Sequence, residues 1–502
     1  MSQIRKRSLK AATWIYLGFF IGAINTYLFT HKGWFLPTEY GLTRSLLDIG
    51  ILVCAFSTMG ATSFLVKFFP YYSDNLESER NDLLAIAVFV SVLGFIITTA
   101  GLNFLQPLII KKFSTNSPLL VEYFYYVIPL GFFVLLYNIL EAYSYGFDKG
   151  VLTSLLKETV LRFYTTIVII LKICNIISFK VFVTLFAFQY LIIFLILGIH
   201  LHRQKKLWLH FKFSKVTLKF RKKIFAILGF TFVVIIVSVL RQSIDGIVLA
   251  ARQDLGKVAI FGLASYLVSA MQAPFRSLVS ITLPILSRSW KDKNIKEIAR
   301  IYNRSSINLL TFSLFVFVCV WLNFDNAILT FKLNLDYLQG KWVFFILGIV
   351  TIIEMGTGVN EQIIGTSTYW RFELWTSLIL TSLIIPLSYL LTVRYGIYGP
   401  ALANLISFSI YNFLRFGFLW KKFRMQPFSR KTAEILAISI VCYLLVHFIF
   451  LNRIGLFSIL LSSFLFALMF ITLMYYRNIS PDVKPVINSI RTKLQLNHKH
   501  VK

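Results

Sequence analysis

Arginines that stand four residues before an aspartate occur inside two long apolar stretches of this sequence. Arg44 precedes Asp48, and Arg241 precedes Asp245. On a helix this spacing puts both side chains on one face, so each pair can neutralise itself within its apolar segment. Alternatively, the planar guanidinium can exchange its carboxylate for a phosphate, whose oxygens suit its paired donors. The sequence leaves both alternatives open.

Two more arginines lie in apolar stretches. Arg276 has no acid within one helical turn, whereas Arg162 follows Glu158 by four residues and has Lys157 nearby. An ionised side chain near the centre of a bilayer costs about 2.5 to 3.5 kcal/mol on insertion scales, so such residues usually face a polar cavity. We therefore expect a substrate-binding cavity of positive potential. Its arginines would be Arg276, Arg241, Arg44 and Arg162.

Acidic residues form a second set of candidates. Glu354 and Glu361 are seven residues apart, which places them on one helix face, and Glu141 lies in an earlier apolar stretch. With Asp48 and Asp245, these carboxylates could bind a coupling cation or a proton. They could equally pair with the arginines, and the pattern does not separate these alternatives.

Lys67 and Arg415 are interpreted differently from the other basic residues in apolar stretches. Each lies within one or two turns of the predicted inner end of its stretch. Long basic side chains at such positions can extend their charged ends to the membrane surface. We therefore expect both to be structural and exclude them from the candidate site.

These residues are embedded in a chain that is 57% hydrophobic and only 14% charged, which excludes an ordinary water-soluble fold. Apolar runs of about 18 residues or more recur throughout, and each is long enough to cross a bilayer as a helix. We predict an all-α membrane protein with about fourteen spans. They lie near residues 11–30, 41–69, 83–105, 121–147, 153–175, 180–202, 224–250, 258–286, 305–325, 341–364, 372–392, 397–420, 434–451 and 454–476.

Landmarks recur at an offset of about 215 residues, as in a duplicated transporter. Gly41 and Pro70 correspond to Gly256 and Pro284, Gly150 and Glu158 to Gly365 and Glu373, and Lys205-Lys206 to Lys421-Lys422. Six spans per repeat preserve orientation, so we predict two parallel six-helix lobes plus two extra C-terminal helices. The expected parts are an N-lobe at 1–207, a basic cytoplasmic linker at 208–223, a C-lobe at 224–422, spans thirteen and fourteen at 423–480, and a basic cytoplasmic tail at 481–502.

The formal net charge of +30 is explained by membrane topology, and a nucleic-acid partner is not expected. Basic residues concentrate in cytoplasmic loops of membrane proteins. The segment from Arg203 to Lys223 holds nine lysines and arginines, and six preceding spans place it inside if the amino terminus is inside. We expect a multi-pass protein of a bacterial inner membrane with both termini cytoplasmic.

Metal and nucleotide chemistry have no motif in this sequence. Cys54, Cys174, Cys319 and Cys442 stand singly in apolar runs, so neither a disulfide framework nor a metal site is expected. No GxxxxGK[ST] loop is present to hold nucleotide phosphates. We expect no cofactor and no ATP-driven transport.

Three stretches resemble the polysaccharide or O-antigen flippases of the multidrug/oligosaccharidyl-lipid/polysaccharide exporter (MOP) superfamily. They are FLPTEYG at Phe35–Gly41, the segment from Arg241 through Asp245 to Gly256, and GIYGPALANLISF at Gly396–Phe408. The resemblance implies a flippase that moves a polyprenyl-pyrophosphate-linked oligosaccharide from the inner to the outer leaflet by alternating access. It also implies a role in cell-surface polysaccharide biosynthesis, such as that of the O-antigen of lipopolysaccharide. Its partners would be the lipid-linked oligosaccharide, membrane lipids, and a polymerase or ligase of the same pathway.

Two other functions fit part of the pattern. A cation-coupled drug or metabolite antiporter of the MATE type would share the superfamily fold, but usually has twelve spans. A membrane-embedded polysaccharide polymerase or glycosyltransferase would act on the same lipid-linked sugars, but such chemistry is expected to use larger outer loops than those between these spans. We therefore expect a transporter and not an enzyme.

Overall fold

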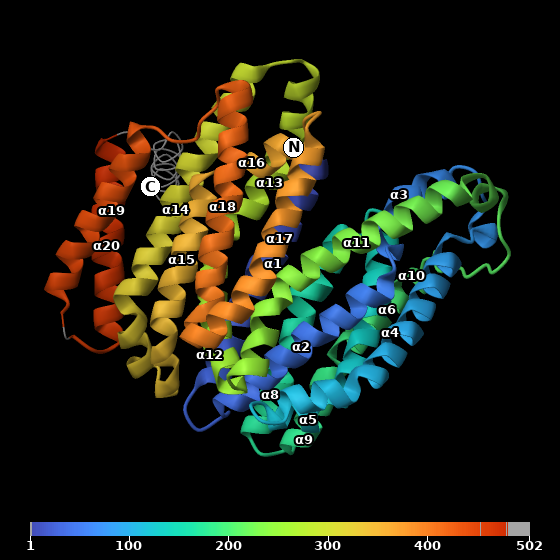
Figure 1. The fold of residues 1–502 in the computed structure, drawn as a ribbon, viewed down its shortest axis with the longest axis horizontal. Coiled ribbons are helices and arrows are strands. Elements are labelled where there is room, and N and C mark those ends of the chain that lie inside the picture. The colour runs from blue at the N-terminus through green and yellow to red at the C-terminus, as the bar shows by residue number, and fades with distance from the viewer. Residues whose placement is uncertain (1–2, 452, 478, 480–502) are drawn as a thin grey trace, which may run out of the picture. The chain divides into compact units, whose positions relative to one another are not determined.

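The computed structural model describes residues 3–451, 453–477 and 479, and their regular secondary structure is helical (Figure 1). Within these described residues, eleven helical segments are long and apolar enough to cross a membrane. The other three expected spans also fall on helices, namely α1 (Gln3–Thr30), the run from α7 to α8 (Gly150–Ile173) and α12 (Leu255–Met271). The prediction of an all-α, multi-pass membrane protein is confirmed, while the total of about fourteen spans stays a prediction.

The chain divides into two compact units, Met1–Ala259 and Ile260–Lys502, and α12 runs across the boundary. Besides α1 and the start of α12, the first unit contains further long helices and the short helices that connect or extend them. Its elements are α2 (Pro37–Thr58), α3 (Ala61–Ser73), η1 (Ser78–Arg80), α4 (Leu83–Phe113), α5 (Pro118–Glu122), η2 (Phe124–Tyr126), α6 (Val127–Tyr145), α7 (Gly150–Ser154), η3 (Leu155–Val160), α8 (Leu161–Ile173), α9 (Phe179–Ala187), α10 (Gln189–Arg203) and α11 (Lys215–Arg252).

The second unit begins within α12 and contains the remaining helices. They are α13 (Ala273–Lys291), α14 (Ile295–Thr330), η4 (Leu335–Gln339), α15 (Gly340–Gly356), α16 (Asn360–Gly365), α17 (Trp370–Tyr395), α18 (Tyr398–Phe423), α19 (Arg430–Ile449) and α20 (Leu456–Tyr476). Within this unit, α19 and α20 pack against each other and both contact α14 (Figure 1).

The second expected span is interrupted where we predicted one continuous helix over 41–69. α2 ends at Thr58 and α3 starts at Ala61, with Met59 and Gly60 between them at positive φ angles of 44° and 81°. Glycine suits this conformation, and a side chain at position 60 would also collide with the carbonyl oxygen of Leu228 on α11. The interruption therefore combines a backbone turn with a close helix approach.

The eighth expected span is interrupted at the corresponding place. α12 ends at Met271, Gln272 intervenes, and Pro274 lies in the first turn of α13. Proline is well tolerated there because the first amides of a helix have no intrahelical acceptor. The two interruptions are separated by about the repeat offset, so the second span of each predicted repeat is a broken helix.

The basic segment at 208–223, predicted as a linker, is helical from Lys215 onward, before the expected start of the seventh span at 224. α11 begins at Lys215, with Ser214 as its N-cap. The carboxylate of Asp82 accepts hydrogen bonds from the Ser214 amide at 2.9 Å and from the Thr217 hydroxyl at 2.6 Å. An acid at this position satisfies otherwise unpaired amides and complements the helix dipole. α11 then packs on α2, α3 and α4 within the first unit.

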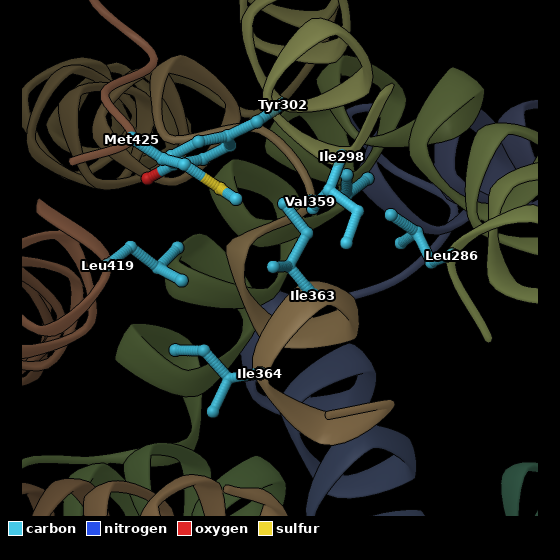
Figure 2. Close-up of a cluster of buried hydrophobic side chains, with 8 residues drawn as sticks. All are labelled: Leu286, Ile298, Tyr302, Val359, Ile363, Ile364, Leu419 and Met425. Carbon is cyan, nitrogen blue, oxygen red and sulfur yellow. The ribbon is translucent and has the colours of Figure 1, made fainter. Parts of the chain in front are cut away.

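A buried apolar cluster in the second unit joins α13, α14, α16 and α18 (Figure 2). Tyr302, Val359 and Ile363 are completely buried in it, and the indole of Trp290 donates a hydrogen bond of 2.9 Å to the carbonyl of Ile363. Its members are Leu286, Ile298, Tyr302, Val359, Ile363, Ile364, Leu419 and Met425. This packing fixes the short helix α16, which carries Glu361, beside the helix α18, which carries Arg415.

Candidate functional site

The aspartates of the two arginine–aspartate pairs, Asp48 and Asp245, lie close to each other within the first unit. Asp48 on α2 interacts electrostatically with Arg44 and with Asp245 on α11. Its carboxylate lies directly against the α-carbon of Gly246, where a side chain would collide with it. Both aspartates are partly buried. The facing surfaces of α2 and α11 therefore carry a cluster of ionisable groups formed by Arg44, Asp48 and Asp245. Arg241 lies one turn before Asp245 on α11.

A cavity of about 580 Å³ lies in the same unit, lined by residues of α2, α3, α6, η3 and α11. The ammonium of Lys157 lies 3.1 Å from the carboxylate of Glu141, whose side chain is 13% exposed. Lys67 lines the cavity as well and is exposed. Two lysines and one glutamate leave the cavity with one excess positive charge. A partly buried amide–thiol contact, from Asn138 to Cys54 at 3.3 Å, forms part of its wall.

Arg162 forms an ion pair with Glu158 and also donates a hydrogen bond to the backbone of α1. One terminal nitrogen lies 2.8 Å from the Glu158 carboxylate, and the other donates a hydrogen bond of 2.8 Å to the carbonyl of Gly18. Gly18 must be glycine here, because a side chain would collide with the Glu158 carbonyl. The sequence left two alternatives for such pairs, an ion pair within one helix or an arginine that binds a substrate phosphate. In this structure Arg162 and Glu158 form the ion pair. Their side chains nevertheless remain about a third and a quarter exposed.

The second unit contains a more deeply buried charge pair that the sequence analysis did not select. Arg415 on α18 is 2% exposed and hydrogen-bonds through both Nε and Nη2 to the Glu373 carboxylate on α17. Glu373 also accepts a hydrogen bond from Tyr411 at 3.2 Å, and the Arg415 guanidinium lies 3.6 Å above the Tyr411 ring. The guanidinium is thus held by a bidentate carboxylate and an aromatic face.

The expectation that Arg415 extends its charged end to the membrane surface is therefore wrong. Lys421 and Lys422 follow it on α18 and indicated a nearby helix end, but the guanidinium is directed inward to Glu373. The sequence did offer one signal for this ion pair, because the repeat offset aligned Glu373 with Glu158, which has an arginine four residues later. Each of these two glutamates pairs with an arginine, Glu158 within its own helix and Glu373 across to the next helix.

The remaining predicted residues of the second unit lie on three different helices. Glu361 on α16 lies 3.6 Å from Arg415, with its side chain half exposed. Glu354 on α15 accepts a hydrogen bond of 3.2 Å from Gln272. Arg276 on α13 is exposed. Glu354 and Glu361 do not share one continuous helix face, because α15 ends at Gly356 and α16 starts at Asn360.

Buried amides extend the polar region around Arg415. Asn412, one turn earlier on α18, accepts hydrogen bonds from Thr357 at 2.9 Å and from Asn360 at 3.2 Å. All three side chains are almost completely buried. The backbone of the break between α15 and α16 is satisfied by α14, because the Ser305 hydroxyl accepts from the Val359 amide at 3.3 Å and the Ser306 hydroxyl donates to the Gly356 carbonyl. Irregular structure in a membrane protein requires such partners. The polar residues around Arg415 thus lie at the break in the tenth expected span, between α15 and α16.

Metal ligation is not indicated by the described part of the chain, which contains no group of three or more histidines, cysteines, aspartates or glutamates arranged to hold a metal ion. The site chemistry is that of guanidinium and ammonium groups, which bind phosphate, and of carboxylates, which exchange protons or cations.

No protein-family model matches the sequence, and no curated protein sequence matches it either. Solved structures do match. A lipid II flippase MurJ in an inward closed conformation superposes with a TM-score of 0.73 and 17% identity, over 94% of this chain and 99% of that one. The chain has the fold of a membrane transporter.

Two MATE structures give the same fold with lower similarity. The MATE multidrug transporter DinF-BH has a TM-score of 0.56 and 17% identity over 84% of this chain and 96% of that one. An inward-facing MATE transporter of the MOP superfamily has a TM-score of 0.52 and 14% identity over 87% and 96%. These matches show the same fold as the transporters that the sequence motifs resembled.

Proposed function

We propose that this chain is a flippase that moves a polyprenyl-pyrophosphate-linked oligosaccharide from the inner to the outer leaflet by alternating access. The observation that carries the proposal is the fold similarity to the lipid II flippase at a TM-score of 0.73 over almost the full length of both chains. The matched MATE structures cover 84% to 87% of this chain. The larger coverage favours a lipid-linked substrate over a soluble drug.

The charges of the first unit support a phosphate-bearing substrate. Its cavity carries Lys67 and Lys157 against Glu141, and these three charged residues belong to the inner halves of their spans if the amino terminus is cytoplasmic. A cavity with excess positive charge on the inner side attracts the pyrophosphate of a lipid assembled in the cytoplasm. Arg44, Arg162 and Arg241 of the first unit and Arg276 of the second unit are proposed as further substrate-binding residues.

The carboxylates are proposed to couple transport to an ion or proton gradient. Glu141 pairs with Lys157 and Glu361 lies near Arg415, so each can exchange a basic partner for a proton or a cation. Glu354 has a neutral amide partner in Gln272. Asp48 and Asp245 interact with each other, and one cation could relieve the repulsion between two such carboxylates.

The cellular setting follows from the substrate. We propose a bacterial inner membrane, cytoplasmic termini, and a cell-surface polysaccharide pathway such as O-antigen synthesis. A polymerase or ligase that uses the flipped lipid at the outer leaflet would be the functional partner. The protein itself would act as a transporter and not as an enzyme.

The proposal is tested with purified protein in liposomes that hold a fluorescent polyprenyl-pyrophosphate oligosaccharide. An external quencher reports how much label reaches the opposite leaflet. Arg276→Ala is expected to reduce the rate at least fivefold without loss of folding, because Arg276 is exposed. Arg288→Ala on the same helix is the matched control, since its side chain is 85% exposed and pairs with Asp292.

Failure to move any pyrophosphate-linked saccharide, together with uptake of cationic drugs by the same liposomes, would favour the antiporter. Equal rates for wild type and Arg276→Ala would leave the flippase in place and remove Arg276 from its site. Transfer of sugar between lipids by the purified protein would instead indicate the polymerase or glycosyltransferase.

A further inference from the structure

A polar pocket of about 320 Å³ lies in the second unit, away from Arg415 and Glu373, where α14, α15, α19 and α20 have neighbouring ends. α19 and α20 are apolar helices joined by the short segment 450–455, and segment 331–339 joins α14 to α15. A turn between two membrane spans must lie at a membrane surface, because lipid cannot satisfy its exposed backbone groups. The pocket is therefore at the depth of lipid head groups.

The charged lining combines two strong cations with one acid. Lys341 on α15 forms an ion pair with Asp325 on α14 and lies 5.0 Å above the Trp321 ring. Arg453, in the turn between α19 and α20, is exposed and lies beside the Phe450 ring. The charges of Lys341, Arg453 and Asp325 sum to one positive charge. His447 adds an imidazole to the same wall.

Hydrogen bonds from α14 hold the pocket together. The Asn326 side chain donates to the carbonyl of Arg453 at 3.3 Å and accepts from the amide of Gly455 at 2.9 Å. One turn earlier, Asn323 accepts from the Ser462 hydroxyl on α20 at 2.8 Å. These contacts fix the turn that carries Arg453 against α14, so the pocket is formed before a ligand arrives.

The surroundings of the pocket suit a lipid. The Trp321 indole donates to the Tyr443 hydroxyl at 3.3 Å, and tryptophan and tyrosine are enriched at membrane interfaces. Along their length, α19 and α20 also expose large apolar side chains. These include Leu444, Leu445, Phe448, Phe457, Leu460 and Phe464.

We propose that this pocket binds the phosphodiester head group of a membrane phospholipid. The guanidinium of Arg453 and the ammonium of Lys341 would donate to the phosphate oxygens, whose single negative charge matches the excess positive charge of the pocket. Asp325 is about half exposed, so its carboxylate also accepts from a hydroxyl or ammonium of the head group. The acyl chains lie along the apolar surface of α19 and α20. This site is independent of the lipid that the chain is proposed to transport.

Native mass spectrometry of the purified full-length protein tests this site by counting retained lipids during titration with phosphatidylglycerol. Arg453→Gln is expected to weaken retention of the tightest lipid about tenfold, and Lys341→Ala is expected to do the same. Arg430→Ala is the matched control, because Arg430 is an exposed arginine at the opposite end of α19. This control is expected to change retention less than twofold.

Two further titrations distinguish the ligands. A diacylglycerol with the same acyl chains should bind at least tenfold more weakly than phosphatidylglycerol, and millimolar glycerol phosphate should not displace the lipid. Equal retention of the diacylglycerol would show that only the apolar surface binds, and displacement by glycerol phosphate would show a site for soluble phosphates. Either result, or equal retention by wild type and Arg453→Gln, would overturn the proposal.

Discussion

Arg415 and Glu373 form a bidentate ion pair between α18 and α17, with an Nε to Oε2 distance of 2.8 Å and side chains only 3% and 13% exposed. Removing both charges from water is costly, and hydrogen bonds from Tyr411 and Ser377 to Glu373 offset part of that cost. The pair joins two consecutive helices by side chains that are 42 residues apart.

Arg415→Ala should destabilise the second unit by about 3 kcal/mol or more, because it leaves the Glu373 carboxylate buried without its cation. Thermal unfolding in detergent measures the effect as a lower transition temperature. The double variant Arg415→Met with Glu373→Gln should recover at least half of the loss, since neither charge remains. Lys421→Ala, an exposed change on the same helix, serves as the control. A double variant as unstable as Arg415→Ala would show that the charge pair is not the cause.

Gly41→Ala should destabilise the first unit by about 1 to 3 kcal/mol, the usual cost of overpacking. Its added methyl group would collide with the carbonyl oxygen of Leu255, a backbone atom that cannot move aside. Gly101→Ala is the matched control, because a methyl group on this helical glycine would meet no neighbour within 4 Å and alanine favours helices. Thermal unfolding should show a lower transition for the first variant and an equal or higher one for the second. Equal transitions would mean that α2 and α12 do not approach this closely.

Cys174 provides a test of the predicted topology. It is exposed just after α8, at the end of the fifth expected span, which lies outside if the amino terminus is inside. A membrane-impermeant maleimide should therefore label Cys174 in right-side-out vesicles and not in inside-out ones. Cys54 and Cys442 are buried and should react only after unfolding, and Cys174→Ser should abolish the fast labelling. The reverse vesicle pattern would invert the topology.

Lys157→Met should reduce flippase activity at least fivefold, because the cavity loses a cation and the Glu141 carboxylate then repels the pyrophosphate. Adding Glu141→Gln should restore part of the rate, since it removes that repulsion. The liposome assay measures both variants, and Lys180→Met, an exposed lysine on α9, is the control. A rate unchanged by Lys157→Met would exclude this cavity from the substrate path.

Apolar run length determined the helices of this protein. A run that can cross a bilayer must satisfy its backbone within one segment, so helix positions follow from composition alone. The expected spans at 83–105 and 372–392, for example, correspond to α4 and α17. Run length could not show that the spans beginning at Gly41 and Val258 are broken, because an apolar run has the same length and hydrophobicity whether or not a turn interrupts its helix.

Helical spacing also determined the local pair of Glu158 and Arg162, since residues four apart meet on any helix. The tertiary structure decided the rest of the candidate site. Asp48 meets Asp245, Glu141 meets Lys157, and Arg415 meets Glu373 across distances along the chain that no spacing rule covers. Such partners depend on which helix faces pack together, and that choice is made by side-chain shape over many residues at once.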